Sequence, residues 1–225
     1  MPSVSSVSRL AGHPAAKPAL GRRARRRVET RERIVRAALK LFARQGFFAT
    51  TVEQVTQAAD VGKGTFFNYF PSKEHVLTGF GDFQLAKIRA AVEEARKRST
   101  PIRVVARRLR LALAEMPGES PELVRSFLLV ILSSGSARPL VLQKLGQGRR
   151  LLSELVAVGQ RRGEIRAELG RSAAARHLQQ MFFGGLLLWT LHPATKLAHW
   201  IKPTFESFWR SVSAPGKRSA RERGL

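Results

Sequence analysis

Apolar side chains recur every three or four residues along most of the chain, which is the spacing of one face of an α-helix. Ile34, Ala37, Ala38, Leu41 and Phe42 show this pattern first. No stretch shows the sustained alternation of apolar and polar residues that is typical of strands. The pattern predicts about nine helices, and we expect an all-α fold. The expected ranges are 30–45, 50–60, 63–69, 72–98, 101–115, 121–134, 138–162, 171–191 and 194–212.

Residues that favour helix ends lie between these ranges. Gly46 follows the first pattern, and glycine readily adopts the left-handed backbone that closes many helices. The second helix has two possible capping boxes, Thr50 with Glu53 or Thr51 with Gln54, in which each side chain bonds the main chain of the other residue. The first three helices are therefore expected to be short and closely spaced.

The charge of the chain indicates the class of partner that this helical protein would bind. The 225 residues include 40 Lys and Arg but only 16 Asp and Glu, for a formal net charge of +24. A positive field of this size favours encounters with polyanions such as nucleic acids or anionic lipids. Because the chain has no cysteine, disulfides, thiolate zinc sites, iron–sulfur clusters and cysteine nucleophiles are excluded.

Composition and charge divide the chain into four parts. The first 30 residues carry seven basic side chains and one acidic side chain, and they are rich in Ser, Pro, Ala and Gly, which disfavours a packed core. We expect a flexible basic arm over 1–29, a three-helix domain over 30–82, a larger helical domain over 83–213 and a basic disordered tail over 214–225. The larger domain holds 22 basic and nine acidic side chains; solvated helix faces explain most of this excess, and attraction of an anionic effector or of DNA is the alternative.

A membrane-spanning or exported protein is not expected. The longest apolar run, Met181 to Leu191, is about half of the roughly 20 residues that a spanning helix needs. The N-terminus lacks the apolar stretch of a signal peptide. We therefore expect a cytoplasmic protein with no membrane partner; basic helices lying on anionic lipid are a lower-ranked alternative.

Residues 63–70 concentrate aromatic and hydrogen-bonding side chains in two helical turns. Phe66 and Phe70 lie four residues apart, so both can pack inward against Phe42 and Val55. The remaining side chains of this helix then lie on its other sides. A helix of this kind fits the major groove of DNA, and glycines at its start allow a phosphate to approach the main-chain N–H groups.

At these residues the sequence resembles the DNA-binding domain of the tetracycline-repressor (TetR) family, over residues 30–77. The matching segments keep the family's order and spacing, and the rest of the chain shares only the helical arrangement and a weaker match near 163–186. The residues that carry the resemblance are Gly46-Phe47, Thr50-Thr51-Val52-Glu53-Gln54-Val55, Ala58-Ala59, Val61 through Phe70 and Ser72-Lys73-Glu74.

The resemblance implies a helix–turn–helix whose second helix enters the major groove. Carried over position by position, the DNA-binding residues are Thr51, Gly62, Lys63, Gly64, Thr65, Phe67, Asn68, Tyr69 and Lys73. Three positions depart from the family: Phe67 replaces a frequent Tyr, Tyr69 a frequent His and Gly62 a frequent Ser. Asn68 suits a bidentate contact to adenine, and a phosphate contact is an equal alternative. The basic arm before the first helix can add minor-groove or phosphate contacts.

The resemblance also implies an effector pocket and a homodimer. Phe127, Ile131 and Trp189 are the expected pocket residues, although the same side chains suit an ordinary core. The helices near 171–191 and 194–212 would form the dimer interface, and a two-fold dimer fits a pseudo-palindromic operator. The expected function is sequence-specific transcriptional regulation, with a repressor released from double-stranded DNA by a small-molecule effector. A non-specific architectural DNA-binding protein is the alternative.

Catalytic and cofactor motifs are absent from the sequence. The five histidines show no HExxH spacing, and GxSxG and Walker patterns do not occur. Gly146-Gln147-Gly148 lacks the third glycine of a dinucleotide fingerprint and lies inside a helical pattern. We expect no enzyme activity, no metal site and no cofactor.

Overall fold

The computed structural model describes residues 21–97, 100–115, 120–192 and 194–215. Within these ranges the chain forms nine helices and no strand, apart from one isolated antiparallel bridge between Ile165 and Ser213. The predicted all-α fold is confirmed. The helices are α1 (Arg22–Gln45), α2 (Val52–Ala58), α3 (Lys63–Tyr69), α4 (Lys73–Arg96), α5 (Ile102–Glu115), α6 (Pro121–Ser133), α7 (Arg138–Arg161), α8 (Arg171–Leu191) and α9 (Leu197–Val212).

The first helix begins earlier than the sequence pattern predicted. It starts at Arg22 rather than near Thr30, so residues 22–29 are helical and not part of a flexible arm. Arg, Ala and Glu are good helix formers, and Arg25 pairs with Glu29 one turn later at 3.1 Å. The Ser- and Pro-rich composition that argued for disorder belongs to residues before 21. The predicted arm over 1–20 and most of the predicted tail, 216–225, lie outside the described residues.

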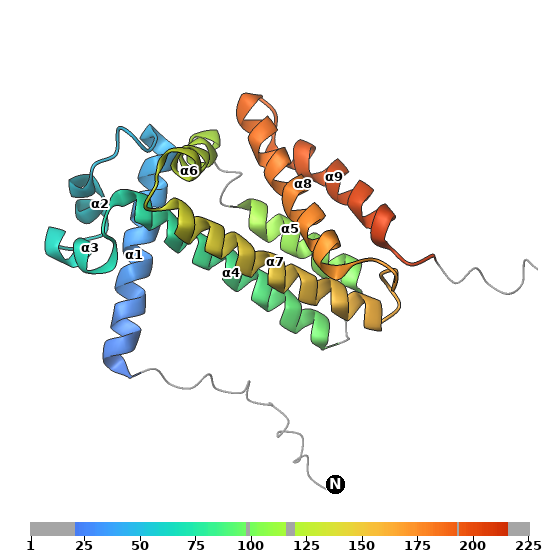
Figure 1. The fold of residues 1–225 in the computed structure, drawn as a ribbon. Coiled ribbons are helices and arrows are strands. Elements are labelled where there is room, and N and C mark those ends of the chain that lie inside the picture. Colours follow the sequence, from blue (N-terminus) through green and yellow to red (C-terminus); the bar gives the residue numbers. More distant parts are fainter. Residues whose placement is uncertain (1–20, 98–99, 116–119, 193, 216–225) are drawn as a thin grey trace, which may run out of the picture.

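Helices α1, α2 and α3 pack together with the start of α4 into a small bundle (Figure 1). Phe42, Val55 and Phe66 are fully buried in its core, and Phe70 is almost so. Phe66 and Phe70 lie with ring centroids 6.0 Å apart. The predicted inward packing of both phenylalanines against Phe42 and Val55 is confirmed, and this packing fixes which face of α3 points outward.

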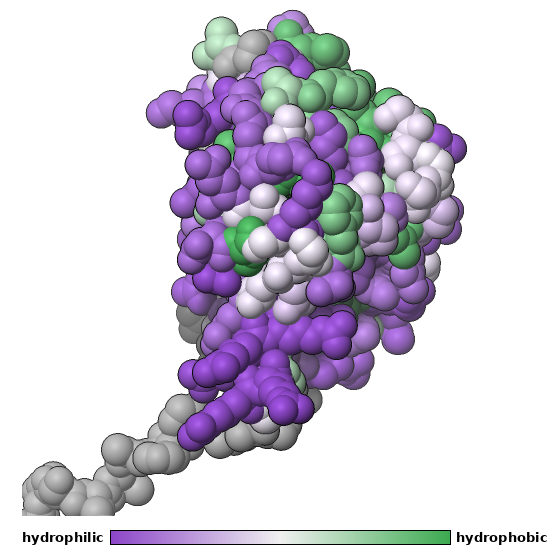
Figure 2. All heavy atoms as spheres, turned by 90° about the vertical axis from the view of Figure 1, so that its left-hand side faces the viewer, coloured by the Kyte–Doolittle hydropathy of each residue, from purple (hydrophilic) through white to green (hydrophobic). Residues whose placement is uncertain are grey.

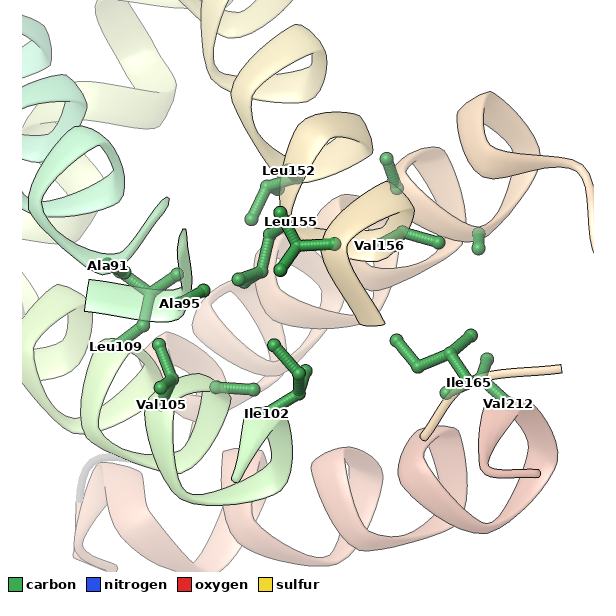
Figure 3. Packing of buried hydrophobic residues seen from close by; sticks show 14 of the residues in the cluster. Ala91, Ala95, Ile102, Val105, Leu109, Leu152, Leu155, Val156, Ile165 and Val212 are labelled. Atoms are coloured by element: carbon green, nitrogen blue, oxygen red, sulfur yellow. The ribbon is translucent and has the colours of Figure 1, made fainter. Parts of the chain in front are cut away.

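The remaining helices form a larger bundle in which α4 runs alongside α7, while α8 and α9 pack together (Figure 1). Its main core gathers aliphatic side chains from α4, α5 and α7 against the turn at Ile165 and the end of α9 (Figure 3). Burial of such side chains is the main favourable term for a helical bundle. In the part of the chain that the structure describes, no single helix is long and apolar enough to cross a membrane, and only a pair bent by 113°, α6 with α7, meets that test jointly.

The two bundles share buried residues across the predicted boundary at residue 82. Leu123 and Val130 of α6 belong to the same core cluster as Phe42 and Phe66. The Ser120 hydroxyl at the start of α6 donates a hydrogen bond of 2.9 Å to the Ala43 carbonyl in α1. The division into separate domains therefore stays a prediction, because α6 is packed into both cores.

An ion-pair network ties α1, α4 and α7 together at the same boundary. Asp82 of α4 lies 3.0 Å from the Arg31 guanidinium in α1 and also accepts a hydrogen bond from the Lys144 ammonium in α7. All three side chains are partly buried. Partly buried pairs are less screened than exposed ones, so this network holds α4 to both neighbours.

Candidate nucleic-acid interface

Hydrogen bonds between residues close in sequence fix both ends of α2, including the tight turn that joins it to α3. Thr51 caps α2: its hydroxyl accepts from the Gln54 N–H at 3.2 Å, and its own N–H donates to the Gln54 side chain at 2.9 Å. The second of the two predicted capping boxes is thus the one that forms. At the other end, Asp60 adopts a left-handed backbone with φ 50°, and Val61 N–H donates to Thr56 C=O at 3.0 Å, which is a Schellman closure.

Helix α3 buries one face and exposes the other. Phe66 is completely buried, while its neighbour Phe67 is 46% exposed and meets the Phe66 ring edge-on. Lys63 and Asn68 are exposed, and Tyr69 is half-buried against the core. Thr65 is half-buried as well, whereas Gly62 and Gly64 are exposed and a Cβ at either would meet nothing within 4 Å. The structure therefore brings the predicted contact residues of α3 to an uncovered surface.

Lys63 forms an ion pair with an acidic residue of the preceding helix. Its ammonium lies 2.5 Å from the Glu53 carboxylate, and both side chains are largely exposed. The hydrogen bond and charge of Lys63 hold the pKa of Glu53 below its usual value. Glu53 is therefore ionised at neutral pH and places a negative charge beside the side chain expected to approach a phosphate.

Lys73 stabilises the loop between α1 and α2, a role that the sequence pattern did not predict. Its ammonium donates to the carbonyls of Phe47 at 2.9 Å and Thr50 at 2.8 Å, with Phe48 C=O at 3.4 Å, and it lies 4.5 Å from the centre of the Phe47 ring. These contacts tie the start of α4 to the loop between α1 and α2. The DNA contact of Lys73 stays a prediction. In that contact, a phosphate would bind an ammonium group that also donates to the carbonyls of this loop.

The start of α1 adds positive charge near the helix–turn–helix. Arg22, Arg23, Arg25, Arg26 and Arg27 are all exposed on its first turns. Figure 2 views the molecule from the side of α2 and α3, and a strongly hydrophilic projection lies below them. An exposed recognition helix beside a row of guanidinium groups is a suitable surface for the phosphates and base edges of a duplex.

A cavity of about 150 Å³ lies between α4, α5, α6, α7, α8 and α9. Of the three expected pocket residues, Phe127 lines it, but Ile131 and Trp189 do not. Trp189 is buried in a separate cluster, where its indole N–H donates to Thr195 C=O at 2.7 Å. Helical spacing alone cannot tell which apolar side of a buried helix faces a cavity and which faces a neighbouring helix.

The sequence analysis missed the most unusual residue of this cavity, Arg110. It lies on the apolar stripe of α5 that includes Ile102, Ala106 and Leu109, and among the described residues it is the only charged side chain that is buried. An arginine at an apolar position of a helical pattern was the available signal. Buried charged groups are rare unless they are paired, so an arginine at this position indicates a candidate binding residue.

The short capped helix, the tight turn and the outward-facing second helix form a helix–turn–helix. Residues 34–80 match the family model of bacterial regulatory proteins, tetR family. This match overlaps the segment 30–77 in which the sequence resembles the family, and it confirms the resemblance there.

Relatives and solved structures agree with this assignment. The regulator TcmR of Streptomyces glaucescens is 48% identical over 56 residues, which are 25% of each chain. RutR of Escherichia coli K12 is 32% identical over 143 residues, 61% of this chain and 64% of that protein. The crystal structure of Thermus thermophilus FadR, a TetR-family repressor in complex with lauroyl-CoA, is 29% identical with a TM-score of 0.62, covering 79% of this chain and 92% of that chain. The matches to the curated relatives thus span from 17% to 64% of the length of those proteins.

Proposed function

We propose that this protein is a transcriptional repressor that binds a pseudo-palindromic operator as a homodimer and is released by a small-molecule effector. The observation that carries the proposal is the uncovered outer face of α3, which the buried Phe66 and Phe70 hold in place. Thr65, Phe67, Asn68 and Tyr69 would meet base edges there, while Lys63 and the main-chain N–H groups at Gly62 and Gly64 would meet phosphates.

The homodimer is supported by exposed leucines at the end of α8. Leu187, Leu188 and Leu191 are about half exposed or more, and an uncovered apolar patch of this kind marks an interaction site. Ala174 and Gly185 of the same helix are buried within the single chain and are not available to a partner. The proposed interface therefore uses the side of α8 that carries the leucines, with the neighbouring face of α9.

Release by an effector is supported by residues that the cavity and the first bundle share. Leu77 and Phe80 of α4 and Leu123 of α6 line the cavity and also belong to the core cluster that holds α3. A ligand that prefers one arrangement of α4 and α6 shifts DNA affinity by its difference in affinity for the two arrangements. FadR, whose structure contains lauroyl-CoA, supports a ligand in the helical domain of this chain.

Sequence-specific binding is tested by competition gel shifts. Genomic fragments selected by the protein are incubated with excess random duplex at two salt concentrations. The proposal predicts that the selected fragment resists competition and that the preference persists as salt weakens phosphate contacts. Equal competition by random duplex at both salts contradicts the proposal and supports the architectural alternative, which the net charge of +24 favours.

The homodimer is tested by light scattering after size-exclusion chromatography. We expect twice the chain mass at micromolar concentration, and a monomer for the Leu187→Glu/Leu191→Glu double variant. Leu111→Glu is the matched control, because Leu111 is a similarly exposed leucine on α5 and should leave the dimer intact. A monomeric wild-type protein would exclude the two-fold operator complex.

A further inference from the structure

The cavity of the larger bundle is lined by residues that are spread over several turns of its helices. Its walls extend from Leu77 to Ile88 on α4 and from Val141 to Leu155 on α7, which corresponds to about 16–21 Å at the helical rise per residue. The cavity volume is only about 150 Å³. A small volume over that length suits a slender chain better than a broad ring system. The walls are mostly aliphatic and aromatic, so the greater part of an occupant must be apolar.

Few polar side chains line the cavity, and nearly all of them are already bonded within the protein. Thr78 and Thr204 donate to carbonyls in their own helices, and Gln179 donates to Leu145 C=O at 3.0 Å. Lys144 is bonded to Asp82. These groups need no ligand. Gln84 donates to Leu113 C=O at 2.9 Å, but its side-chain oxygen is buried without a partner.

Arg110 differs from this set because it is charged, buried and unmatched. The side chain lines the cavity and is only 9% exposed. No described residue accepts a hydrogen bond from its Nε or Nη1, and both atoms are shielded from solvent. Its guanidinium lies 5.5 Å from the centre of the Phe205 ring. The ring offsets part of the cost of burying the charge, but it does not accept hydrogen bonds from the N–H groups in the guanidinium plane.

A buried guanidinium cannot avoid the cost of its unpaired charge by losing its proton. Burial lowers the pKa of Arg110, yet arginine stays protonated in proteins. The nearby Glu206 is engaged with Arg103 at 2.7 Å. A buried charge is costly unless it is paired and hydrogen-bonded. An anionic group could supply both the opposite charge and the hydrogen-bond acceptors that Arg110 lacks within the described residues.

We propose that the cavity binds an anionic amphiphile, a molecule with a slender apolar chain and one carboxylate head group, and that Arg110 holds the carboxylate. Arginine binds carboxylates through two parallel hydrogen bonds. Gln84 contacts α5 at Leu113, about one helical turn from Arg110, so its free oxygen can accept a hydrogen bond from a donor near the head group. This inference rests on the proposed effector function and names the ligand class of that site.

The experiment measures binding of simple amphiphiles to the full chain by isothermal titration calorimetry, below their micelle-forming concentrations. Decanoate, decanol and decyltrimethylammonium share an apolar chain and differ in the head group; hexanoate and tetradecanoate test chain length. We expect decanoate to bind at least about tenfold more tightly than decanol, since a charged hydrogen-bonded pair is lost, and the cation to bind most weakly. Equal binding of decanoate and decanol, or no binding of any carboxylate, overturns the proposal.

Variants then assign the head-group contact. Arg110→Met should weaken decanoate binding by about 10- to 100-fold and leave decanol binding unchanged. Arg107→Met is the matched control, because Arg107 is exposed on the same helix, and it should bind decanoate like the wild type. Wild-type affinity in Arg110→Met contradicts the assignment; if this variant fails to fold, the comparison of decanoate with decanol on the wild type still decides.

DNA binding by the same preparations separates this inference from the proposed function. A wild-type protein that prefers its operator over random duplex but ignores the carboxylates leaves the repressor proposal intact and removes the ligand class. If the protein binds decanoate through Arg110 but shows no preference among duplexes, the ligand class is supported and the repressor proposal fails.

Discussion

The outer face of α3 and the cavity of the larger bundle differ in how their residues are distributed along the chain. The first comes from seven consecutive residues, Lys63–Tyr69, held by two phenylalanines from behind. The second is assembled from six helices between Leu77 and Phe205. A surface made of neighbours in sequence depends on local helix geometry, whereas a cavity depends on how distant helices pack. This difference determines which changes should damage each region.

The largest expected effect comes from removing the anchor of the recognition helix. Phe66→Ala truncates a fully buried ring and should lower the free energy of unfolding by about 3–5 kcal/mol, through lost burial and a residual cavity. Chemical denaturation followed by circular dichroism measures this change. The same variant should lose operator binding because α3 is no longer held against the core.

Phe67→Ala is the matched control for that variant, because Phe67 is the adjacent ring and is half exposed. It should change stability far less and still weaken DNA binding, which separates anchoring from contact. Comparable destabilisation by the two substitutions would show that α3 is not oriented as described.

The next effect concerns the outer face itself. Asn68→Ala should cost about 1–3 kcal/mol of operator binding and relax base preference at one position if the amide contacts an adenine edge. Lys63→Ala should weaken binding to all duplexes and reduce the salt dependence. Fluorescence anisotropy with operator variants measures both. A uniform loss with Asn68→Ala would assign that residue to a phosphate instead.

A third pair of substitutions compares two glycines of α7. A Cβ at Gly148 would lie in ordinary contact with Ile88 and Leu85 at 3.5 and 3.7 Å, whereas a Cβ at Gly159 would lie 2.6 Å from Ile165 Cδ1. Gly148→Ala should therefore stabilise the protein by about 0.5–1 kcal/mol through helix propensity. Gly159→Ala should destabilise it by about 1–3 kcal/mol through overpacking. Thermal unfolding tests the opposite signs, and equal signs would contradict the packing around α7.

The smallest effect tests the ion pair at the start of α3. Glu53 is ionised at neutral pH and paired with Lys63, so Glu53→Gln removes a negative charge from the proposed interface and frees the ammonium for a phosphate. We expect DNA binding to become a few-fold tighter, as is typical of an exposed pair. Glu168→Gln, an exposed carboxylate on the turn before α8, is the control and should leave affinity unchanged. Weaker binding by Glu53→Gln would mean that the pair positions Lys63 for DNA.

Local patterns predicted the fold and the first bundle well. The bounds of α3 and the inward pair Phe66 and Phe70 follow from short-range spacing, and the structure confirms them. Spacing left two capping boxes open for α2, and the structure selects the one at Thr51. The predicted start of α1 was wrong. Residues 22–29 are rich in charge and were interpreted as disordered, although they favour helices. Composition averaged over a long segment hid the change at Gly21.

The binding residues of the larger bundle could not be predicted in the same way. Phe127 lines the cavity but Trp189 does not, although both lie on apolar helix faces, because the cavity depends on contacts between helices distant in sequence. Lys73 is similar: its bonds to Phe47 and Thr50 span more than 20 residues. Arg110 was visible as a charge on an apolar stripe, but its lack of a partner became apparent only in three dimensions.

The central claim, that the outer face of α3 contacts base pairs, is tested most directly by the operator affinity of one variant, Thr65→Ala/Asn68→Ala/Tyr69→Ala. Circular dichroism should show the variant still folded, since Phe66 and Phe70 are untouched. We expect the affinity of this variant for the operator to fall to its affinity for random duplex. An operator affinity equal to that of the wild type would contradict the claim.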